Sequence, residues 1–517
     1  MASTQKLHFR LHYLLAGLAL VVAAVLWAQT PLTLDDAFIS YRYARNLVQG
    51  QGLVFNSGEL VEGYTNFLWV LIAALAIACK ADPFAATRLL GVLSYGIGVL
   101  FCAQALYATA PQRISSLLLV AFLGMLLLPD GLLAAVGTGL ETAFVGTLGI
   151  LLGLSLFVWS ERIRAAYLIA AGTALILLLT RLDAVLPVAA AGLVFWLSRL
   201  PNGVRSATWH TAVQFAIPAL GLIIYLLWKI SYYGELLPNT YYAKGGDLWS
   251  WEQGKAYLRS FLSSNPQVAA ALPLAFLAAF AADAPTWRRF AQYALLTVLL
   301  RCAYVGKVGG DFMQYRFIWE TYPLLICAAA IGLGKLASLT EPLWAFALVL
   351  VCLVLSAQPA TLDNKFGQQW PDEMDRYARE GQQVGKALYA VLPENTVIAT
   401  TLVGTLGYYT NLKIVDQWGL TDRFIAHMPV SRIVTRGHVK FAPQEYLRSR
   451  GVNLYIAHPQ LCSCSQPCTE ALPNVFIRVE RDLCVRSWYF GQTDDLTRHF
   501  CSHPQNFVLH NIICPSS

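Results

Sequence analysis

Charged residues are scarce in this chain of 517 residues: Asp, Glu, Lys and Arg make up 13%, and apolar residues make up 56%. Soluble globular proteins carry about 25% charged residues. This deficit and a mean hydropathy of +0.51 exclude an ordinary soluble protein and predict a polytopic membrane protein. The net charge of +7 comes without a basic block or an RNA-binding motif, so we expect no nucleic-acid partner.

Several catalytic motifs are also missing. The chain has no convincing Walker A, H-E-x-x-H or G-x-S-x-G motif, which argues against an ATP-driven pump, a metalloprotease and a hydrolase. The segment "GTLG" (Gly404–Gly407) lacks the G-x-G-x-x-G spacing of a dinucleotide site, so it predicts only a turn between a strand and a helix. No residue set predicts a resident metal; a divalent cation is left open.

What the chain does have is a series of apolar segments that ends near Ser356. They predict about 11–13 membrane helices, although several are shorter than the roughly 20 residues that span a bilayer. We interpret the first as a signal anchor, because Lys6 and Arg10 precede it and many spans follow. The loop 30–65 is then outside. The segments are 13–29, 66–79, 89–108, 115–128, 142–159, 165–180, 184–197, 213–228, 268–282, 290–304, 319–334 and 343–356.

The composition changes after Gln358, where charged residues return. We therefore expect a transmembrane domain at 1–357 and an α/β domain at 358–517. The basic loops at 161–164, 198–205, 285–290 and 334–339 predict cytoplasmic turns, which makes the second domain extracytoplasmic. Within the second, residues 371–392 predict an amphipathic helix, "NTVIATT" and "LKIVDQ" predict short strands, and "QEYLRSRGVNLYIAH" predicts a helix, a glycine stop and a strand.

Cysteines are crowded near the end of the chain, in residues 462–514. An even number in one soluble segment predicts up to three disulfides and an oxidising compartment, in agreement with the charge-based topology. A metal site is the alternative, because His499 and His503 flank one cysteine, but C-x-C-x3-C is not a standard zinc spacing. The six are Cys462, Cys464, Cys468, Cys484, Cys501 and Cys514.

Ionisable residues of the membrane half gather on the expected outer face. Such groups are costly to bury at a membrane edge and are often functional; simple solvation at the interface is the alternative for any one of them. Together they predict an outward-facing cavity lined with carboxylates and a few cations. The clusters are Asp35/Asp36/Arg42, Glu59/Glu62, Glu141, Arg181/Asp183, Glu235/Asn239/Lys244 and Asp311/Arg316.

Five motifs carry a resemblance to a known family. They are "DDAFISYRYARNLVQGQGLVFNSGELVEGYTNFLW" from Asp35, "GLE" at Gly139–Glu141, "YYGELLPNTYYAK" at Tyr232–Lys244, "VGGDFMQYRF" at Val308–Phe317, and "GYYTNLKIVDQWGLTD" at Gly407–Asp422 with "GHVK" at Gly437–Lys440. These resemble the GT-C membrane glycosyltransferases, most closely the branch of the cell-wall terminal arabinofuranosyltransferases. The cysteine-rich tail and "TRLD" (180–183) depart from that pattern.

The resemblance implies an inverting glycosyltransferase of the bacterial plasma membrane with its site outside. The donor would be a polyprenyl-phosphate sugar, with arabinofuranose or a similar pentose expected, and the acceptor a glycan, lipid-linked saccharide or protein. A carboxylate must deprotonate the acceptor hydroxyl, and cations must hold the departing phosphate. The Asp pair can supply the base, with Asp35 slightly favoured over Asp36.

The other candidates follow from the same chemistry. Arg42, Lys244 and Arg316 are the expected ligands of the donor phosphate. If residues from Asp36 onward are helical, Arg42 and Asn46 share one face; a snorkelling arginine is the equal alternative. We assign sugar or acceptor binding to Glu62, Tyr64, Glu141, Asn239 and Asp311.

Two other classes of protein remain as alternatives. A transporter or flippase would show inverted repeats and ionisable groups at mid-membrane, and we find no such repeat. A non-catalytic assembly protein would tolerate Asn at both Asp35 and Asp36.

Overall fold

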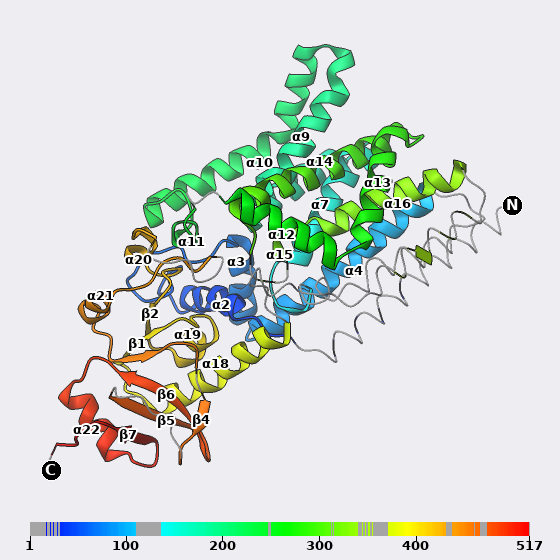
Figure 1. Cartoon of the computed structure of the whole chain (residues 1–517). Helices are drawn as coiled ribbons and strands as arrows, with labels where there is room; N and C mark the ends of the chain where they lie inside the picture. Colours follow the sequence, from blue (N-terminus) through cyan, green and yellow to red (C-terminus); the bar gives the residue numbers. More distant parts are fainter. Residues whose placement is uncertain are drawn as a thin grey trace.

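The structure is a computed structural model. It describes residues 32–109, 136–246, 250–311, 315–339, 371–430, 437–459, 461–465 and 473–515, together with the single positions 17, 21, 24, 28, 313, 344, 347, 350, 351 and 354. The expected span 115–128, most of the spans 13–29 and 343–356, and the expected domain boundary at 357/358 lie outside these residues. Helices occupy one end of the molecule and a sheet the other, where the chain ends (Figure 1).

Long apolar helices form the first part. Five of them in the described residues are long and apolar enough to cross a membrane, or six if α12 and α13, bent by 99°, form one span. This confirms a polytopic helical membrane protein. The helices are α3 (Phe67–Ala78), α4 (Pro83–Thr109), α7 (Thr142–Gly153, extended by helical turns to Glu161), α8 (Ala166–Thr180), α9 (Val185–Arg199), α10 (Val204–Tyr233), α12 (Trp251–Ser264), α13 (Gln267–Ala281), α14 (Pro285–Val308) and α16 (Tyr322–Leu339).

The helices differ in how much of their apolar surface the protein covers. In α16, 78% of the apolar stretch is buried, whereas in α10 the share is 11%. A helix that is apolar on all sides and exposed on most of them is stable only in lipid. We therefore place α10 at the periphery of the bundle; in Figure 1 α9 and α10 stand out from the other helices.

A mixed sheet forms the second part, with strand order β2-β1-β3-β6-β5-β7 and β4 beside β6. β1, β2 and β3 are parallel, and the other pairings are antiparallel. The expected helix, strands and glycine stop are confirmed. The elements are α18 (Pro371–Val391), β1 (Val397–Thr400), α19 (Thr405–Thr410), β2 (Lys413–Asp416), α20 (Arg423–His427), α21 (Gln444–Ser449), β3 (Leu454–Ile456), β4 (Leu461–Ser463), β5 (Asn474–Glu480), β6 (Leu483–Tyr489), α22 (Asp494–Ser502) and β7 (Phe507–His510).

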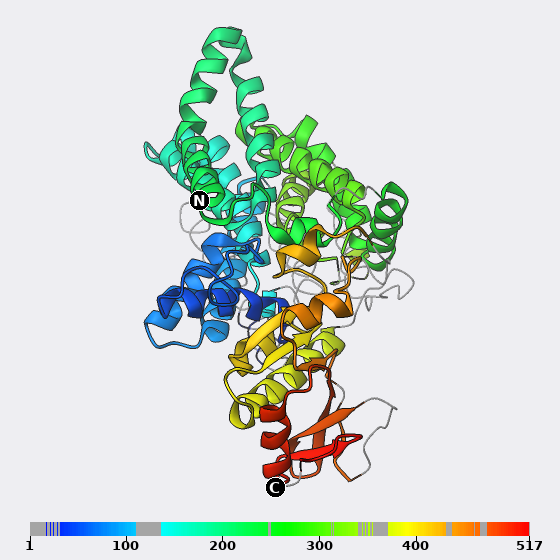
Figure 2. The same ribbon diagram turned by 90° about the vertical axis from the view of Figure 1, so that its left-hand side faces the viewer.

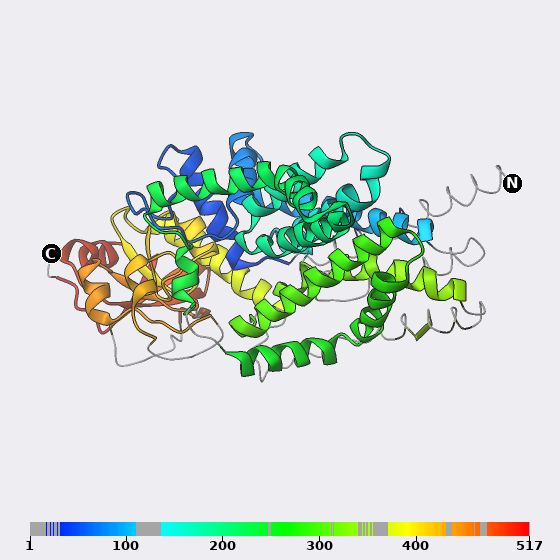
Figure 3. The same ribbon diagram turned by 90° about the horizontal axis from the view of Figure 1, so that it is seen from above.

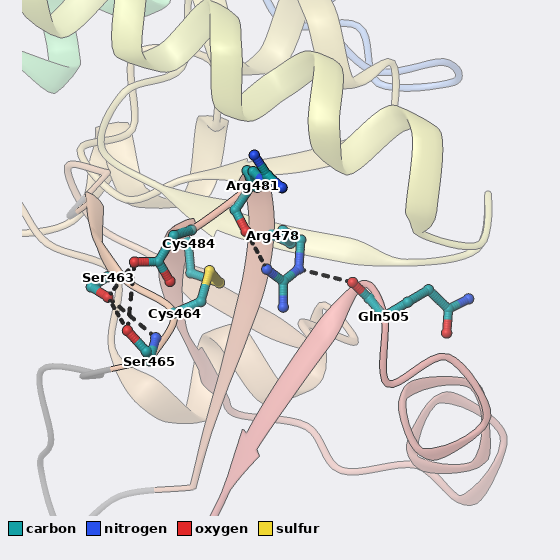
Figure 4. Close-up of a disulfide and its surroundings, with 8 residues drawn as sticks. Ser463, Cys464, Ser465, Arg478, Arg481, Cys484 and Gln505 are labelled. Carbon is teal, nitrogen blue, oxygen red and sulfur yellow. Dashed lines mark hydrogen bonds between the residues drawn. A yellow bond between two sulfur atoms is a disulfide. The ribbon is translucent and has the colours of Figure 1, made fainter.

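Two disulfides staple the end of this part. Cys464 bonds to Cys484 and so joins β4 to β6 (Figure 4). Cys501 in α22 bonds to Cys514. The expectation of disulfides is thus confirmed for four of the six cysteines, while Cys468 lies outside the described residues. Among the residues that the structure describes, no group of three His, Cys, Asp or Glu side chains could hold a metal.

Three short helices lie where the two parts meet: α2 (Asp35–Val48), α11 (Asn239–Ala243) and α15 (Arg316–Trp319). α2 forms over the predicted residues and shares one apolar core with the sheet part; Phe38 packs on the rings of Phe84, Tyr408 and Tyr409. Figures 2 and 3 show the helices and the sheet as neighbouring bodies along the long axis of the molecule. Their junction carries most of the candidate site residues.

Candidate active site

Asp35 holds the first turn of α2 to the sheet part. Its carboxylate accepts hydrogen bonds from the backbone N–H groups of Gly404 at 2.8 Å and Thr405 at 2.6 Å, and from the Thr405 hydroxyl at 2.7 Å. These N–H groups open α19, where a negative charge is favourable. Gly404 has no room for a side chain, because a Cβ would lie 1.8 Å from the carbonyl oxygen of Asp35. Both carboxylate oxygens of Asp35 therefore already accept hydrogen bonds from within the protein.

The guanidinium group of Arg42 likewise forms its hydrogen bonds within the protein. It is 4% exposed and donates to the carbonyls of Phe55, Gly407 and Leu412 and to the Asn56 side chain at 2.5–3.1 Å. At least four of its five N–H groups are thus used within the protein. Arg42 thus binds the carbonyl end of α19, opposite the end that Asp35 holds, and its role as a ligand of the donor phosphate stays a prediction.

Asp36 lies in different surroundings from its neighbour. Its Oδ2 faces Nη1 of Arg316 at 3.5 Å, and its side chain is 32% exposed. Nε of Arg316 lies 3.8 Å from Oδ2 of Asp311, whose Oδ1 accepts a 2.6 Å hydrogen bond from the hydroxyl of Tyr257. Gly309 and Gly310, with φ of +88° and +84°, form the turn that brings Asp311 and Arg316 here. The structure thus brings together three candidates from two distant motifs.

Lys244 completes this cluster. Asp36, Arg316 and Asp311 all act on its charge, and burial lowers its pKa. The chain passes it closely at Gly437, where a Cβ would lie 3.6 Å from the lysine side chain. The next residue, His438, also senses Asp36 and Lys244; burial lowers the pKa of His438 to about 4, so its ring is neutral at pH 7.

Five charged side chains form a second network among the helices. Arg181 pairs with Glu141 at 2.7 Å, Asp183 at 2.9 Å and Glu320 at 3.2 Å. Arg301 pairs with Asp183 at 2.6 Å and Glu320 at 2.8 Å. Glu141 is therefore bound within this network, which joins α7, α8, α14 and the start of α16. Sequence reasoning missed Arg301 and Glu320, although an arginine inside an apolar helix is itself a signal.

Three other candidates hold α10 to the first loop and α11 to the sheet part. Glu62 pairs with Lys229 of α10 at 2.6 Å, and Tyr64 shares a 3.0 Å hydrogen bond with Tyr233. The side-chain amide of Asn239 donates to the carbonyls of Gly419 and Leu420. No hydrogen bond or ion pair among the residues that the structure describes joins Glu62, Tyr64 or Asn239 to Asp36.

The site therefore consists of a partly open carboxylate, Asp36, paired with Arg316, and a lysine, Lys244, whose charge interacts with both. Burial raises the pKa of Asp35 to about 6, against the effect of its hydrogen bonds from Thr405 and Gly404. A protonated Asp35 would lose an acceptor for these donors, so the geometry favours its carboxylate form. Chemically, the cluster can bind an anion and take a proton beside it.

The fold matches that of a solved membrane protein. The structure of ArnT from Cupriavidus metallidurans bound to undecaprenyl phosphate superposes with a TM-score of 0.58 at 13% identity, over 91% of this chain and 97% of that one. The apo structure of the same protein gives a TM-score of 0.56. The chain has the GT-C fold of multi-pass membrane proteins, as the motifs led us to expect.

Within that class, the sequence is similar to two curated proteins named terminal beta-(1->2)-arabinofuranosyltransferase. The one from Mycobacterium tuberculosis is 25% identical over 351 residues, which are 58% of this chain and 52% of the relative. The one from Corynebacterium glutamicum is 27% identical over 334 residues, 55% and 45% of the two chains. The chain thus spans about half the length of the curated relatives it matches. Residues 370–500 match a family described as a domain of unknown function (DUF8728).

Proposed function

We propose that this protein is an inverting glycosyltransferase of the bacterial plasma membrane that takes its sugar from a polyprenyl-phosphate donor. The observation that carries the proposal is the position of Asp36, paired with Arg316 and beside Lys244. The named relatives support the activity, and they favour arabinofuranose or a similar pentose as the sugar. The acceptor is a glycan, a lipid-linked saccharide or a protein.

The chemistry is a single displacement. The acceptor hydroxyl oxygen attacks the anomeric carbon, the bond from that carbon to the phosphate oxygen breaks, and the polyprenyl phosphate leaves with the electron pair. Asp36 takes the hydroxyl proton, while Arg316 and Lys244 hold the phosphate and its increased charge. Asp311, fixed by Tyr257, orients Arg316 and is placed to accept a sugar hydroxyl.

The same reasoning gives the orientation in the membrane. We propose that residues 1–357 form the membrane part and residues 358–517 an extracytoplasmic part, with the site between them. The two disulfides support this side, because disulfides persist in oxidising compartments. The donor lipid would then reach the site from the bilayer and the acceptor from outside.

The experiment that tests the proposal compares two Asp→Asn variants with the wild-type protein. Transfer is measured from a synthetic polyprenyl-phosphate arabinofuranose to cell-envelope acceptor, with glycan analysis of the expressing cells. We expect Asp36→Asn to lose activity by about 10²–10⁴-fold. Asp495→Asn is the matched control, because that side chain is 95% exposed on α22. Normal transfer by an inserted Asp36→Asn protein would refute this role; no transfer by the wild type from any polyprenyl-phosphate sugar would refute the activity.

A further inference from the structure

A row of aromatic rings leads away from the candidate site along one edge of the sheet. The centroid of Trp418 lies 3.7 Å from that of His438 and 5.7 Å from that of His458. The ring of Tyr377 lies 5.1 Å from that of His458. The row therefore runs from Tyr377 on α18 through His458 and Trp418 to His438, next to Lys244.

The row lies at the place in the sheet where open α/β folds bind ligands. β1, β2 and β3 are parallel, and their carboxyl ends share one edge. Trp418 follows β2 by two residues and His458 follows β3 by two. Thr401, directly after β1, shares a 2.8 Å hydrogen bond with Nδ1 of His458. Ligands in such sheets bind outside the carboxyl ends of the strands.

One atom of the row points to a ligand independently. The indole Nε1 of Trp418 is buried and has no hydrogen-bond partner among the described residues. Buried indole N–H groups usually find an acceptor, so an unused one beside a candidate site calls for a group supplied from elsewhere. The rings of Tyr377, Trp418 and His458 are also only half-buried, which leaves part of each ring accessible.

These features fit a carbohydrate better than other ligands. Sugar rings present apolar C–H faces to aromatic rings and hydroxyl groups to hydrogen-bonding side chains, and binding sites commonly combine aromatic walls with a few polar groups. Burial lowers the pKa of both His438 and His458, so their rings are neutral at pH 7 and can both donate to and accept from hydroxyl groups. The four rings of the row carry no positive charge that would bind an anionic ligand; Lys244 lies at its end, beside His438.

We propose that Tyr377, His458, Trp418 and His438 form a binding site for an acceptor oligosaccharide, with the reacting end at Asp36. The assignment of the oligosaccharide as acceptor rests on the proposed function; the binding of a saccharide does not. The sheet part is then the element that selects which glycan is extended, and the unused indole N–H of Trp418 donates to a sugar oxygen.

The test measures binding and transfer separately on full-length protein in detergent. Binding is followed by saturation-transfer NMR with synthetic arabinofuranosyl, galactofuranosyl and mannosyl oligosaccharides, without donor. We expect Trp418→Ala to weaken binding about tenfold or more, and Trp418→Phe, which keeps a ring but loses the N–H, to weaken it less. Tyr377→Ala is compared with Tyr389→Ala, a change on the same helix at a side chain that is 62% exposed; only the former should weaken binding.

The outcomes separate this inference from the proposed function. If wild-type protein binds a saccharide and Trp418→Ala reduces binding while no donor supports transfer, the binding site stands and the enzyme proposal fails. If transfer occurs, Trp418→Ala should raise KM for the acceptor with KM for the donor unchanged. Equal saccharide binding by wild type and Trp418→Ala, or no binding by the wild type, would overturn the inference. Thermal unfolding of Trp418→Phe checks that the site is intact.

Discussion

At the scale of single residues, Asp35 and Asp36 are adjacent in sequence but face different partners. Successive residues of a helix point about 100° apart, so one carboxylate can reach α19 while the next reaches Arg316. The sequence shows the pair but not which partner each meets, and our slight preference for Asp35 as the base is not supported by these contacts. The geometry favours Asp36 for the chemistry and Asp35 for the structure.

The two residues therefore predict opposite kinds of defect. Asp35→Asn places an NH2 group or a single acceptor against three donors, and we expect it to lower the stability by about 1–3 kcal/mol. Asp36→Asn should leave the stability within about 0.5 kcal/mol, because its side chain is partly exposed. Thermal unfolding in detergent measures both. A stable Asp35→Asn protein beside an unfolded Asp36→Asn protein would contradict the assignment.

His438 predicts a pH dependence of stability. Its pKa is about 4 in the folded protein and near 6.5 when unfolded, so the unfolded state binds more protons between these values. Its contribution is complete above pH 6.5 and is lost as the pH falls toward 4, by an upper limit of roughly 3 kcal/mol. Lys244, Asp36 and His458 act on its charge. The variant His438→Gln keeps these three neighbours but removes the titrating ring. Its thermal unfolding midpoint should therefore fall less than that of the wild type between about pH 6.5 and 4. Equal falls in the two midpoints would argue against a neutral buried ring.

At the scale of elements, α2 and α19 hold each other at both ends. Asp35 binds the N–H groups that open α19, and Arg42 and Arg45 bind the carbonyls of Gly407, Tyr408 and Leu412 that close it. Each charge matches the sign of the helix dipole at its end. A helix of six residues is not stable alone, so we infer that α19 depends on α2 for its conformation.

Arg42→Met tests this dependence. The substitution keeps an unbranched side chain but leaves buried carbonyls without donors, and we expect the stability to fall by about 2–4 kcal/mol. Arg498→Met is the control, because the Arg498 side chain is 66% exposed on α22. Thermal unfolding measures the loss. Unchanged stability, with a loss of activity alone, would instead point to a role of Arg42 at a ligand.

A buried ion pair joins the first loop to α10. The Lys229 and Glu62 side chains are 0% and 4% exposed and 2.6 Å apart, and burial raises the pKa of Glu62 to about 7. Removing one partner leaves the other charge buried, so Lys229→Met should cost about 3–5 kcal/mol at pH 8. Adding Glu62→Gln should restore most of that loss. Additive effects in this double-mutant cycle would mean that the two side chains do not interact.

At the scale of the whole molecule, the local elements could be predicted from the sequence, but the ion pairs could not. Short apolar runs locate β1, β2 and β3, an amphipathic period locates α18, and a glycine stop locates the end of α21, since those signals lie within a few residues. Arg450 pairs with Glu59, and Arg42 with Gly407, across 391 and 365 positions. Such distances carry no local pattern. The motifs gather Asp36, Asp311, Lys244 and Arg316 on one face of the protein. They do not show that Arg42 binds backbone carbonyls at the end of α19.

The disulfides predict how the sheet part loses stability. Each closes a short loop: Cys464 and Cys484 are 20 positions apart in the sequence, and Cys501 and Cys514 are 13 positions apart. Replacing both cysteines of either pair by Ser should lower the stability by about 3 kcal/mol. Cys79→Ser is the control, because Cys79 is exposed and unbonded. Thermal unfolding of the three variants measures the effect. Equal unfolding midpoints for the three would show that neither disulfide contributes to stability.

The contacts between α2 and α19 also have a consequence in time. Asp35 and Gly404 are 369 positions apart, and ribosomes add about 5–20 residues per second. The first turn of α2 therefore waits roughly 20–70 s after its own synthesis before its partner exists. During that interval Phe38 and Tyr41, both buried in the finished protein, have to be sheltered elsewhere, and the membrane beside the first loop is the nearest apolar surface. The order of synthesis thus makes the candidate site one of the last regions of the protein to form.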